Sequence, residues 1–239
     1  MRNLLLVGIL MVISQAGFGQ TPSASELLDR SIQYHDPSGN WGKVPVSFQF
    51  TTAFPGRDDR YLKVSIDVYQ EKFEVAPAGE KPQGPVRRMV KDSCSVDWDG
   101  KTSFSAEETK KYRLSCQAIQ RTRDYYTYLY GLPMKLKDPG TNLREAVRQE
   151  FVGEVKCWVL TVDYDPEVGT DTWEFFFHPE TYQMMAYRFY RGEEPKGEHI
   201  LMKGEVEVGG MKLPKDRVWL YWPSYKYLAT DFMTEAGTE

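Results

Sequence analysis

Residues 155–190 constrain the fold more than any other stretch of the chain. They read as three consecutive antiparallel strands, 155–164, 171–178 and 181–190, because β-branched and aromatic residues alternate along them with a period of two. Apolar side chains emerge on both faces of these strands. An antiparallel sheet usually leaves one face in water, so we expect core to cover one face and helices or a ligand to cover the other.

The rest of the chain supplies further strands joined by short turns. Alternating apolar residues predict the strands 44–50, 62–68, 146–151, 200–208 and 211–222. In the last hairpin, which turns at Gly209-Gly210, we place Val206 and Val208 against Val218 and Leu220. We count about ten strands in all, most of them joined as hairpins.

Two helices are predicted. The first begins at a capping box, Ser23 to Glu26, and ends before Pro37, because the residue before a proline disfavours helical angles. The second spans 117–131 and leads into an apolar loop, 132–136. Exposed apolar loops are uncommon without a partner, so we place this helix and loop over the open face of the central strands. The elements together define an α+β fold built on an antiparallel sheet.

The N-terminus predicts export. Residues 1–19 have the layout of a cleaved signal peptide, with Arg2 before an apolar run and small residues at the end, and the run is too short to span a bilayer. No cysteine stands directly after the cleavage point, where a lipid anchor would be attached, and no later apolar run has the length of a transmembrane span. We expect a periplasmic or secreted protein without a lipid anchor, in which residues 20–239 form a single domain.

Net charge and cysteine positions give further information on the class of protein. Without residues 1–19 the formal net charge moves from −4 to −5, which argues against a nucleic-acid partner. Disulfides are permitted in an exported protein. Cys94 and Cys116 flank a hairpin and a charged segment, so they can form a bridge or stay as thiols, whereas Cys157 alternates with valines and reads as a buried thiol.

Enzymatic chemistry would have to use the three histidines, because the sequence holds no GxSxG, HExxH or CxxC motif and no phosphate-binding glycine loop. At ~3.3 Å per residue, His178 and His199 lie about 30 Å apart along the sheet, which excludes a shared metal or catalytic site. His35 beside Asp36 can act as an acid/base pair, but the same sequence is typical of a turn that ends a helix. We expect no catalytic residue, no metal ligand and no cofactor.

Aromatic and methionine side chains suggest a ligand site instead. The candidate ligand-binding residues are Tyr126, Tyr130, Leu132, Met134, Trp158, Phe176 and Tyr187. Trp158, Phe176 and Tyr187 would form the wall on the sheet, and the other four would form a lid. Methionine adapts to irregular apolar guests, and tyrosine joins an apolar body to a polar tip. The alternative for each residue is ordinary core packing.

Several segments resemble those of known proteins. Four of them resemble an uncharacterised family of exported proteins from Bacteroidota: Tyr34–Trp41, Leu129–Thr141, His178–Tyr182 and Lys212–Trp219. The order of elements, including a helix that ends in Gly-Leu-Pro, is similar to the lipoprotein-carrier fold of LolA and its relatives. This second resemblance implies a strongly curved antiparallel sheet, a half-open barrel, with two helices and bound acyl chains on its concave face.

We therefore expect an exported, monomeric, non-enzymatic binding or carrier protein for a hydrophobic small molecule or an acyl chain. One alternative is a secreted hydrolase that acts on lipid or glycan through His35 and Asp36. Another is an envelope interaction module without a small ligand. Fold alone does not decide among these functions.

Overall fold

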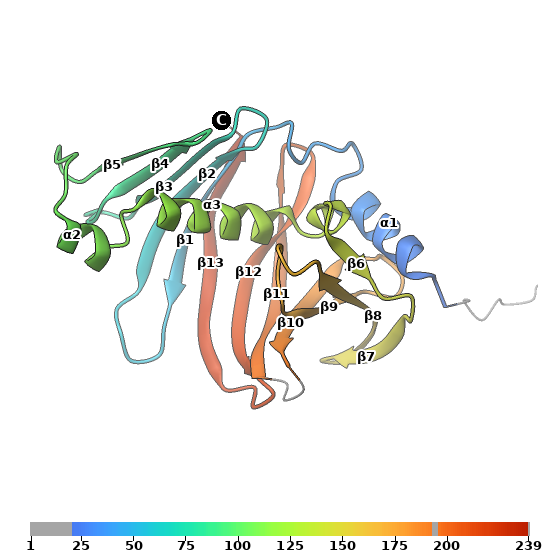
Figure 1. The fold of residues 1–239 in the computed structure, drawn as a ribbon. Coiled ribbons are helices and arrows are strands. Elements are labelled where there is room, and N and C mark those ends of the chain that lie inside the picture. Colours follow the sequence, from blue (N-terminus) through green and yellow to red (C-terminus); the bar gives the residue numbers. More distant parts are fainter. Residues whose placement is uncertain (1–20, 193–195, 239) are drawn as a thin grey trace, which may run out of the picture.

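The computed structural model describes residues 21–192 and 196–238, so the predicted signal peptide lies outside the described residues. The described chain forms one large antiparallel sheet with helices packed on one face (Figure 1). We call the face under these helices the inner face and the opposite one the outer face.

Thirteen strands make up the sheet in the described residues. They are β1 (Val46–Ala53), β2 (Arg60–Asp67), β3 (Lys72–Pro77), β4 (Val86–Val90), β5 (Ser93–Asp97), β6 (Thr141–Leu143), β7 (Arg148–Val152), β8 (Val155–Tyr164), β9 (Thr172–Phe177), β10 (Met184–Arg191), β11 (Lys196–Val208), β12 (Met211–Trp222) and β13 (Tyr227–Thr238). Their order is β5-β4-β3-β2-β1-β13-β12-β11-β10-β9-β8-β6, and β7 also pairs with β8. The C-terminal strand β13 therefore lies in the middle of the sheet, between β1 and β12.

The sheet is open, because its end strands β5 and β6 do not pair with each other. It is neither closed nor strongly curled (Figure 1), so the prediction of a strongly curved half-barrel is not supported. The α+β class and the antiparallel pairing are confirmed. The three central strands that the sequence predicted are β8, β9 and β10, and they pair as a meander.

Register departs from the prediction in the last hairpin. Val208 pairs with Met211 and Val206 with Leu213, because a two-residue turn at Gly209-Gly210 fixes the pairing. Val218 instead lies opposite Leu201. The strand β13 was not predicted, because polar residues interrupt its alternation and its pairing with β1 contains an irregularity.

The described helices are α1 (Ala24–His35), α2 (Ala106–Lys111), α3 (Cys116–Gly131) and the 3-10 turn η1 (Met134–Lys137). At the start of α1 the Ser23 hydroxyl accepts the Glu26 amide, as expected, while the Glu26 carboxylate pairs with Arg30. Helix α2 is short, has no buried residue and was not predicted; a full capping box of Ser105 and Glu108 starts it. Helix α3 runs across the strands of the inner face (Figure 1).

The main core lies between the inner face and the helices. Leu27 and Leu28 of α1 and Ile119 of α3 belong to one buried cluster with strand residues such as Phe48 and Phe175. A second, smaller cluster lies on the outer face and consists of Cys157, Val159, Phe176 and Ala186. The prediction that β8 to β10 are apolar on both faces is therefore confirmed. None of the described helices combines the length and the apolar content needed to cross a membrane.

Candidate ligand-binding site

Two pockets flank helix α3 on the inner face. The large pocket has a volume of about 610 Å³ and lies among the β2–β3 turn, α3 and the β8–β9 loop. The small pocket has a volume of about 480 Å³ and lies among α3, the β1–β2 loop and strands β10 to β13. Both volumes fall in the range of small-molecule sites in proteins, roughly 300–1,000 Å³.

Three aromatic residues, Tyr125 and Tyr128 of α3 and Trp173 of β9, line both pockets. The Trp173 ring stacks on Phe189 with a centroid distance of 4.5 Å and meets the Tyr128 ring at 5.2 Å. The Tyr128 hydroxyl bonds to the Tyr164 hydroxyl. These contacts hold the rings of Tyr128 and Trp173 in place. The two rings therefore form a fixed partition between the two pockets.

Tyr125 differs from its neighbours in this partition. Its side chain is 48% exposed, although the surrounding protein desolvates its hydroxyl and raises the pKa well above the ordinary value. A residue that is closely surrounded yet reached by solvent lies in a hollow rather than on a flat surface. The apolar ring of Tyr125 therefore forms part of the wall of a water-accessible hollow.

Exposed apolar side chains from three distant segments converge on the large pocket. Val68 is 42% exposed and Val168 is 56% exposed, and both line this pocket with Tyr125. They come from the β2–β3 turn, the β8–β9 loop and α3, respectively. Clustered exposed apolar surface marks a binding site more often than isolated exposed residues do.

The predicted lid residues lie mostly in the core. Tyr126 and Tyr130 are buried, and Tyr130 stacks on Phe48 of β1 with a centroid distance of 4.1 Å. Leu132 is fully buried, and Met134 is partly buried against the same core. The apolar loop after α3 is thus covered by the protein itself. Core packing accounts for these four residues, and their ligand role stays a prediction.

The predicted sheet residues do not share one face. Phe176 pairs with Val159 and Ala186 and belongs to the outer cluster. Trp158 is opposite Phe177 and packs, half-buried, against the main core. The prediction that Phe176 forms one wall with Trp158 and Tyr187 was wrong. Side chains alternate between the two faces of a strand, and Phe175 and Phe177, on either side of Phe176, point inward. Of the seven predicted residues, only Tyr187 lines one of the two pockets.

The sequence did hold a signal for the residues that line the pockets. Tyr125 and Tyr128 are three positions apart on α3, so they share one side of the helix, while Tyr126 and Tyr130 share another. The first pair lines the pockets and the second pair enters the core. A helix with two aromatic stripes covers a core with one stripe and a hollow with the other.

His35 and Asp36 fasten the end of α1. The ring of His35 is fully buried; its Nε2 accepts the Met184 amide at 2.9 Å, and its Nδ1 donates to the Lys212 carbonyl at 2.6 Å. Burial lowers the pKa of His35, which keeps the ring neutral. The Asp36 carboxylate accepts the amides of residues 40 and 41 at 2.7 and 2.8 Å. Both groups are occupied, so this pair offers no free acid or base.

The other two histidines lie apart. His178 accepts the amides of Glu180 and Thr181, both at 3.2 Å, and so shapes the β9–β10 turn. His199 is opposite Arg188, two residues from the predicted position, and lies on the outer face. The described residues contain no group of three or more side chains that could hold a metal ion.

Charged residues cover the outer cluster. Arg188 pairs with Glu174 and Glu150, and its guanidinium lies 4.2 Å from the centroid of the Trp222 ring. Arg148 pairs with the same two glutamates. Burial raises the pKa of Glu150, but hydrogen bonds from the two arginines outweigh it and leave the pKa below its ordinary value. This network closes the outer face of β8 to β10, which none of the described helices covers.

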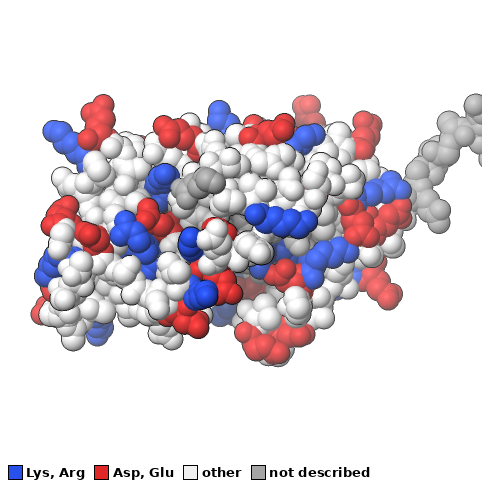
Figure 2. Space-filling model, turned by 90° about the horizontal axis from the view of Figure 1, so that it is seen from above, with Lys and Arg blue, Asp and Glu red and all other residues white. Residues whose placement is uncertain are grey.

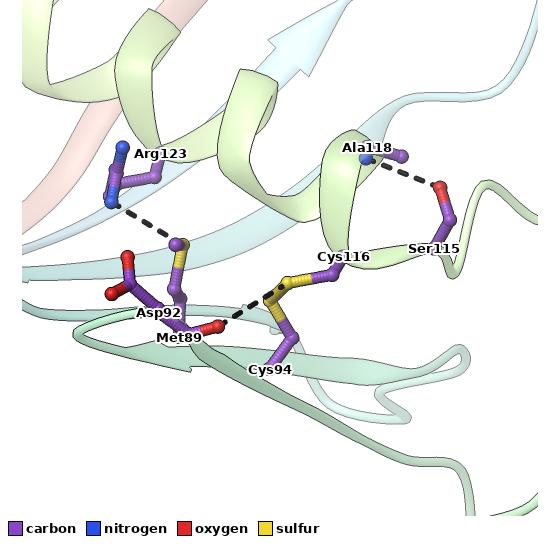
Figure 3. The surroundings of a disulfide bond; sticks show 7 residues. All are labelled: Met89, Asp92, Cys94, Ser115, Cys116, Ala118 and Arg123. Atoms are coloured by element: carbon purple, nitrogen blue, oxygen red, sulfur yellow. Dashed lines mark hydrogen bonds between the residues drawn. A yellow bond between two sulfur atoms is a disulfide. The ribbon is translucent and has the colours of Figure 1, made fainter.

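Cys94 and Cys116 form a disulfide with a Cα–Cα distance of 5.4 Å. The bridge joins β5 to the first residue of α3, next to the Ser115 hydroxyl that accepts the Ala118 amide (Figure 3). Cys157 is a buried free thiol, as predicted, and burial raises its pKa to about 11. The disulfide thus anchors the helix that borders both pockets.

Basic and acidic residues are interspersed on the surface seen in Figure 2, with no extended area of one sign. Over this surface, electrostatics alone does not favour one class of partner.

The large antiparallel sheet with helices on one face is similar to that of several solved structures. A LolA superfamily protein from Nitrosomonas europaea superposes with a TM-score of 0.54 at 11% identity, covering 90% of this chain and 93% of that one. A putative outer membrane lipoprotein-sorting protein domain from Vibrio parahaemolyticus gives a TM-score of 0.54 at 8% identity, with the same coverage of 90% and 93%. A DUF1329 family protein from Desulfovibrio piger gives 0.52 at 10% identity, again covering 90% and 93%.

At the level of the sequence, the chain belongs to a family of unknown function, DUF6503, whose profile matches residues 2–236. No curated protein matches the chain significantly. The predicted similarity to the LolA-like fold is confirmed as a similarity of fold. Because the sequence identities to the solved structures are so low, these similarities support the architecture and say nothing about activity.

Proposed function

We propose that this protein is an exported, monomeric binding or carrier protein for a lipid-like hydrophobic ligand, which it holds in the large pocket beside α3. The observation that supports this best is the convergence of Val68, Tyr125 and Val168 on one hollow, where each leaves much of its apolar side chain in contact with solvent. A ligand that covered these side chains would remove apolar surface from water, at roughly 25 cal/mol per Å².

The walls of the large pocket suit an apolar guest. Ile66 and Trp173 add further apolar surface, and charged residues such as Lys72 and Asp138 lie among the lining residues. Pockets of this kind hold a ligand through shape and apolar contact, with a few polar groups that orient it. The Cys94–Cys116 bridge supports an oxidising compartment, since disulfides are rare in the cytosol.

Extraction of the purified protein with organic solvent, followed by mass spectrometry, tests the proposal directly. We expect a co-purifying lipid, and we expect a fluorescent fatty acid to bind and to be displaced by unlabelled fatty acid. Recovery of no lipid, together with no binding of the fluorescent probe, would contradict the proposal.

A variant pair tests the place of binding. Val168→Asp puts a charge into the mouth of the large pocket at an exposed position, so it should weaken probe binding about tenfold or more without unfolding the protein. Phe151→Asp is the matched control, because Phe151 is 64% exposed on β7 and lines neither pocket. Equal affinity in the two variants would place the ligand elsewhere.

A further inference from the structure

The small pocket differs from the large one in its chemistry. Arg57 and Arg60 line its mouth, and no ion pair involves either of them in the described part of the chain. The Arg57 guanidinium lies 3.4 Å from the centroid of the Phe54 ring, and that of Arg60 lies 5.6 Å from it. Their chain neighbours Asp58 and Asp59 do not line the pocket. Arg60 also donates to the Thr52 hydroxyl at 3.2 Å. Two guanidinium groups thus lie against one aromatic ring at the pocket, and neither is held in an ion pair within the described residues.

Two acidic residues also line the small pocket, and neither forms an ion pair with these arginines within the described residues. The carboxylate oxygens of Asp231 are directed to other donors, the Thr52 hydroxyl at 2.6 Å and the Trp219 indole N–H at 2.8 Å. Glu198 lines the same pocket and makes no hydrogen bond or ion pair within the described residues, and burial raises its pKa. Tyr187 also lines the small pocket, and its buried hydroxyl has no hydrogen-bond partner among the described residues.

The two pockets adjoin each other along one set of rings. Tyr125, Tyr128 and Trp173 line both of them, and Tyr125 is the exposed member of the three. An elongated molecule that lies in the large pocket would therefore reach the small pocket by passing Tyr125. The large pocket offers apolar surface at one end of this path, and the small pocket offers the guanidinium groups of Arg57 and Arg60 at the other. This arrangement suits an amphiphile, a molecule with an apolar chain and a charged head.

We propose that the ligand is a single-chain amphiphile with an anionic head, whose chain lies in the large pocket and whose head lies in the small pocket against Arg57 and Arg60. This inference rests on the proposed function and adds the class of ligand to it. A guanidinium presents a planar fork of N–H donors that matches a carboxylate or a phosphate, and the ring of Phe54 holds that fork in place.

The test compares hexadecanoic acid, hexadecyl phosphate and uncharged methyl hexadecanoate by calorimetric titration of the full protein. We expect one or both anions to bind at least about tenfold more tightly than the ester, because charge-assisted hydrogen bonds are the strong ones. The tighter of the two anions identifies the head group. An ester that binds as tightly as both anions would overturn the inference while leaving the proposed function intact, whereas failure of all three to bind would remove both.

Three variants make the test sharper. Arg57→Gln and Arg60→Gln should each cut the affinity for the anion about tenfold and leave that for the ester unchanged. Glu198→Gln should strengthen anion binding, because it removes a like charge from the pocket. Arg121→Gln is the matched control: it makes the same charge change at an exposed position of α3 outside both pockets. An anion preference that survives Arg57→Gln and Arg60→Gln would overturn the assignment.

Discussion

His35 shows how a single side chain can join three elements. Its two ring nitrogens bind backbone groups of β10 and β12, while its own backbone closes α1. The sequence offered it as either a catalytic base or a helix-ending residue. The tertiary contacts favour the second role, because a ring with both nitrogens occupied and no exposed surface reaches no substrate.

His35→Phe should destabilise the protein without affecting ligand binding by the folded form. The phenyl ring keeps most of the volume but removes the partner of the Lys212 carbonyl and leaves the buried Met184 amide without one, at a cost of about 2–4 kcal/mol. Urea unfolding followed by tryptophan fluorescence measures this loss. An unfolding free energy equal to that of the wild type would show that the two hydrogen bonds of the His35 ring contribute nothing to stability.

The stability of the folded protein should depend on pH through His199. Burial, with the charge of Arg188, lowers its pKa to about 4. The unfolded chain, with the ordinary pKa of about 6.5, takes up the proton first. The folded state therefore has its full advantage above pH 6.5 and loses it as the pH falls toward 4.

A His199→Leu variant isolates the contribution of His199 to the pH dependence of the unfolding free energy. Between pH 7 and pH 5 the wild type should lose up to about 2 kcal/mol more unfolding free energy than the variant does. Urea unfolding at both pH values gives the difference. The lowered pKa of Glu150 keeps its ion pair with Arg188 charged in this range. Parallel losses in the two proteins would contradict the neutral, buried state of His199.

At the scale of elements, the disulfide fixes the start of α3 to β5, an edge strand of the sheet. The closed loop spans a sequence separation of 22 residues. Loops of about this length gain roughly 3 kcal/mol from the bridge, chiefly because the unfolded chain is constrained. Since α3 borders both pockets, the bridge also helps to define their shape.

Replacing both partners, Cys94→Ser with Cys116→Ser, should lower the unfolding free energy by about 3 kcal/mol and weaken probe binding. Cys157→Ala serves as the comparison, because it leaves the bridge in place. If reducing agent changes neither the stability nor the affinity of the wild type, the bridge does not hold the helix. Chemical unfolding with and without reductant provides the measurement.

At the scale of the whole molecule, β13 unites two halves. One half is the N-terminal meander β1 to β5, and the other runs from β6 to β12. The strand pairs with β1 on one side and β12 on the other, so both halves depend on the last segment of the chain to form one sheet. The continuous sheet therefore forms only when β13 is in place.

Hydrogen exchange should reveal this arrangement. Amides of β1, β12 and β13 in the middle of the sheet should exchange most slowly, at rates set by global unfolding, and those of the edge strand β6 should exchange fastest. Mass spectrometry of peptic fragments reports the order. Faster exchange in β13 than in β6 would mean that the two halves fold separately.

The sequence by itself determined the local elements. Alternation of apolar residues defined β8 to β10 and their two buried faces, the Ser23 cap and Pro37 defined the limits of α1, and the predicted span 117–131 lies within one residue of α3. It also indicated the LolA-like order of elements and the candidate bridge. These features depend on spacing along the chain, which the sequence states directly.

Tertiary structure decided which faces meet. It set Phe176 outside and Tyr187 inside, turned Tyr126 into core and Tyr125 into pocket wall, and placed β13 between strands distant in sequence. It also brought Val68, Tyr125 and Val168 into one hollow. The physical reason is that a hollow is what packing leaves unfilled, and packing depends on the register and twist of strands far apart in the chain.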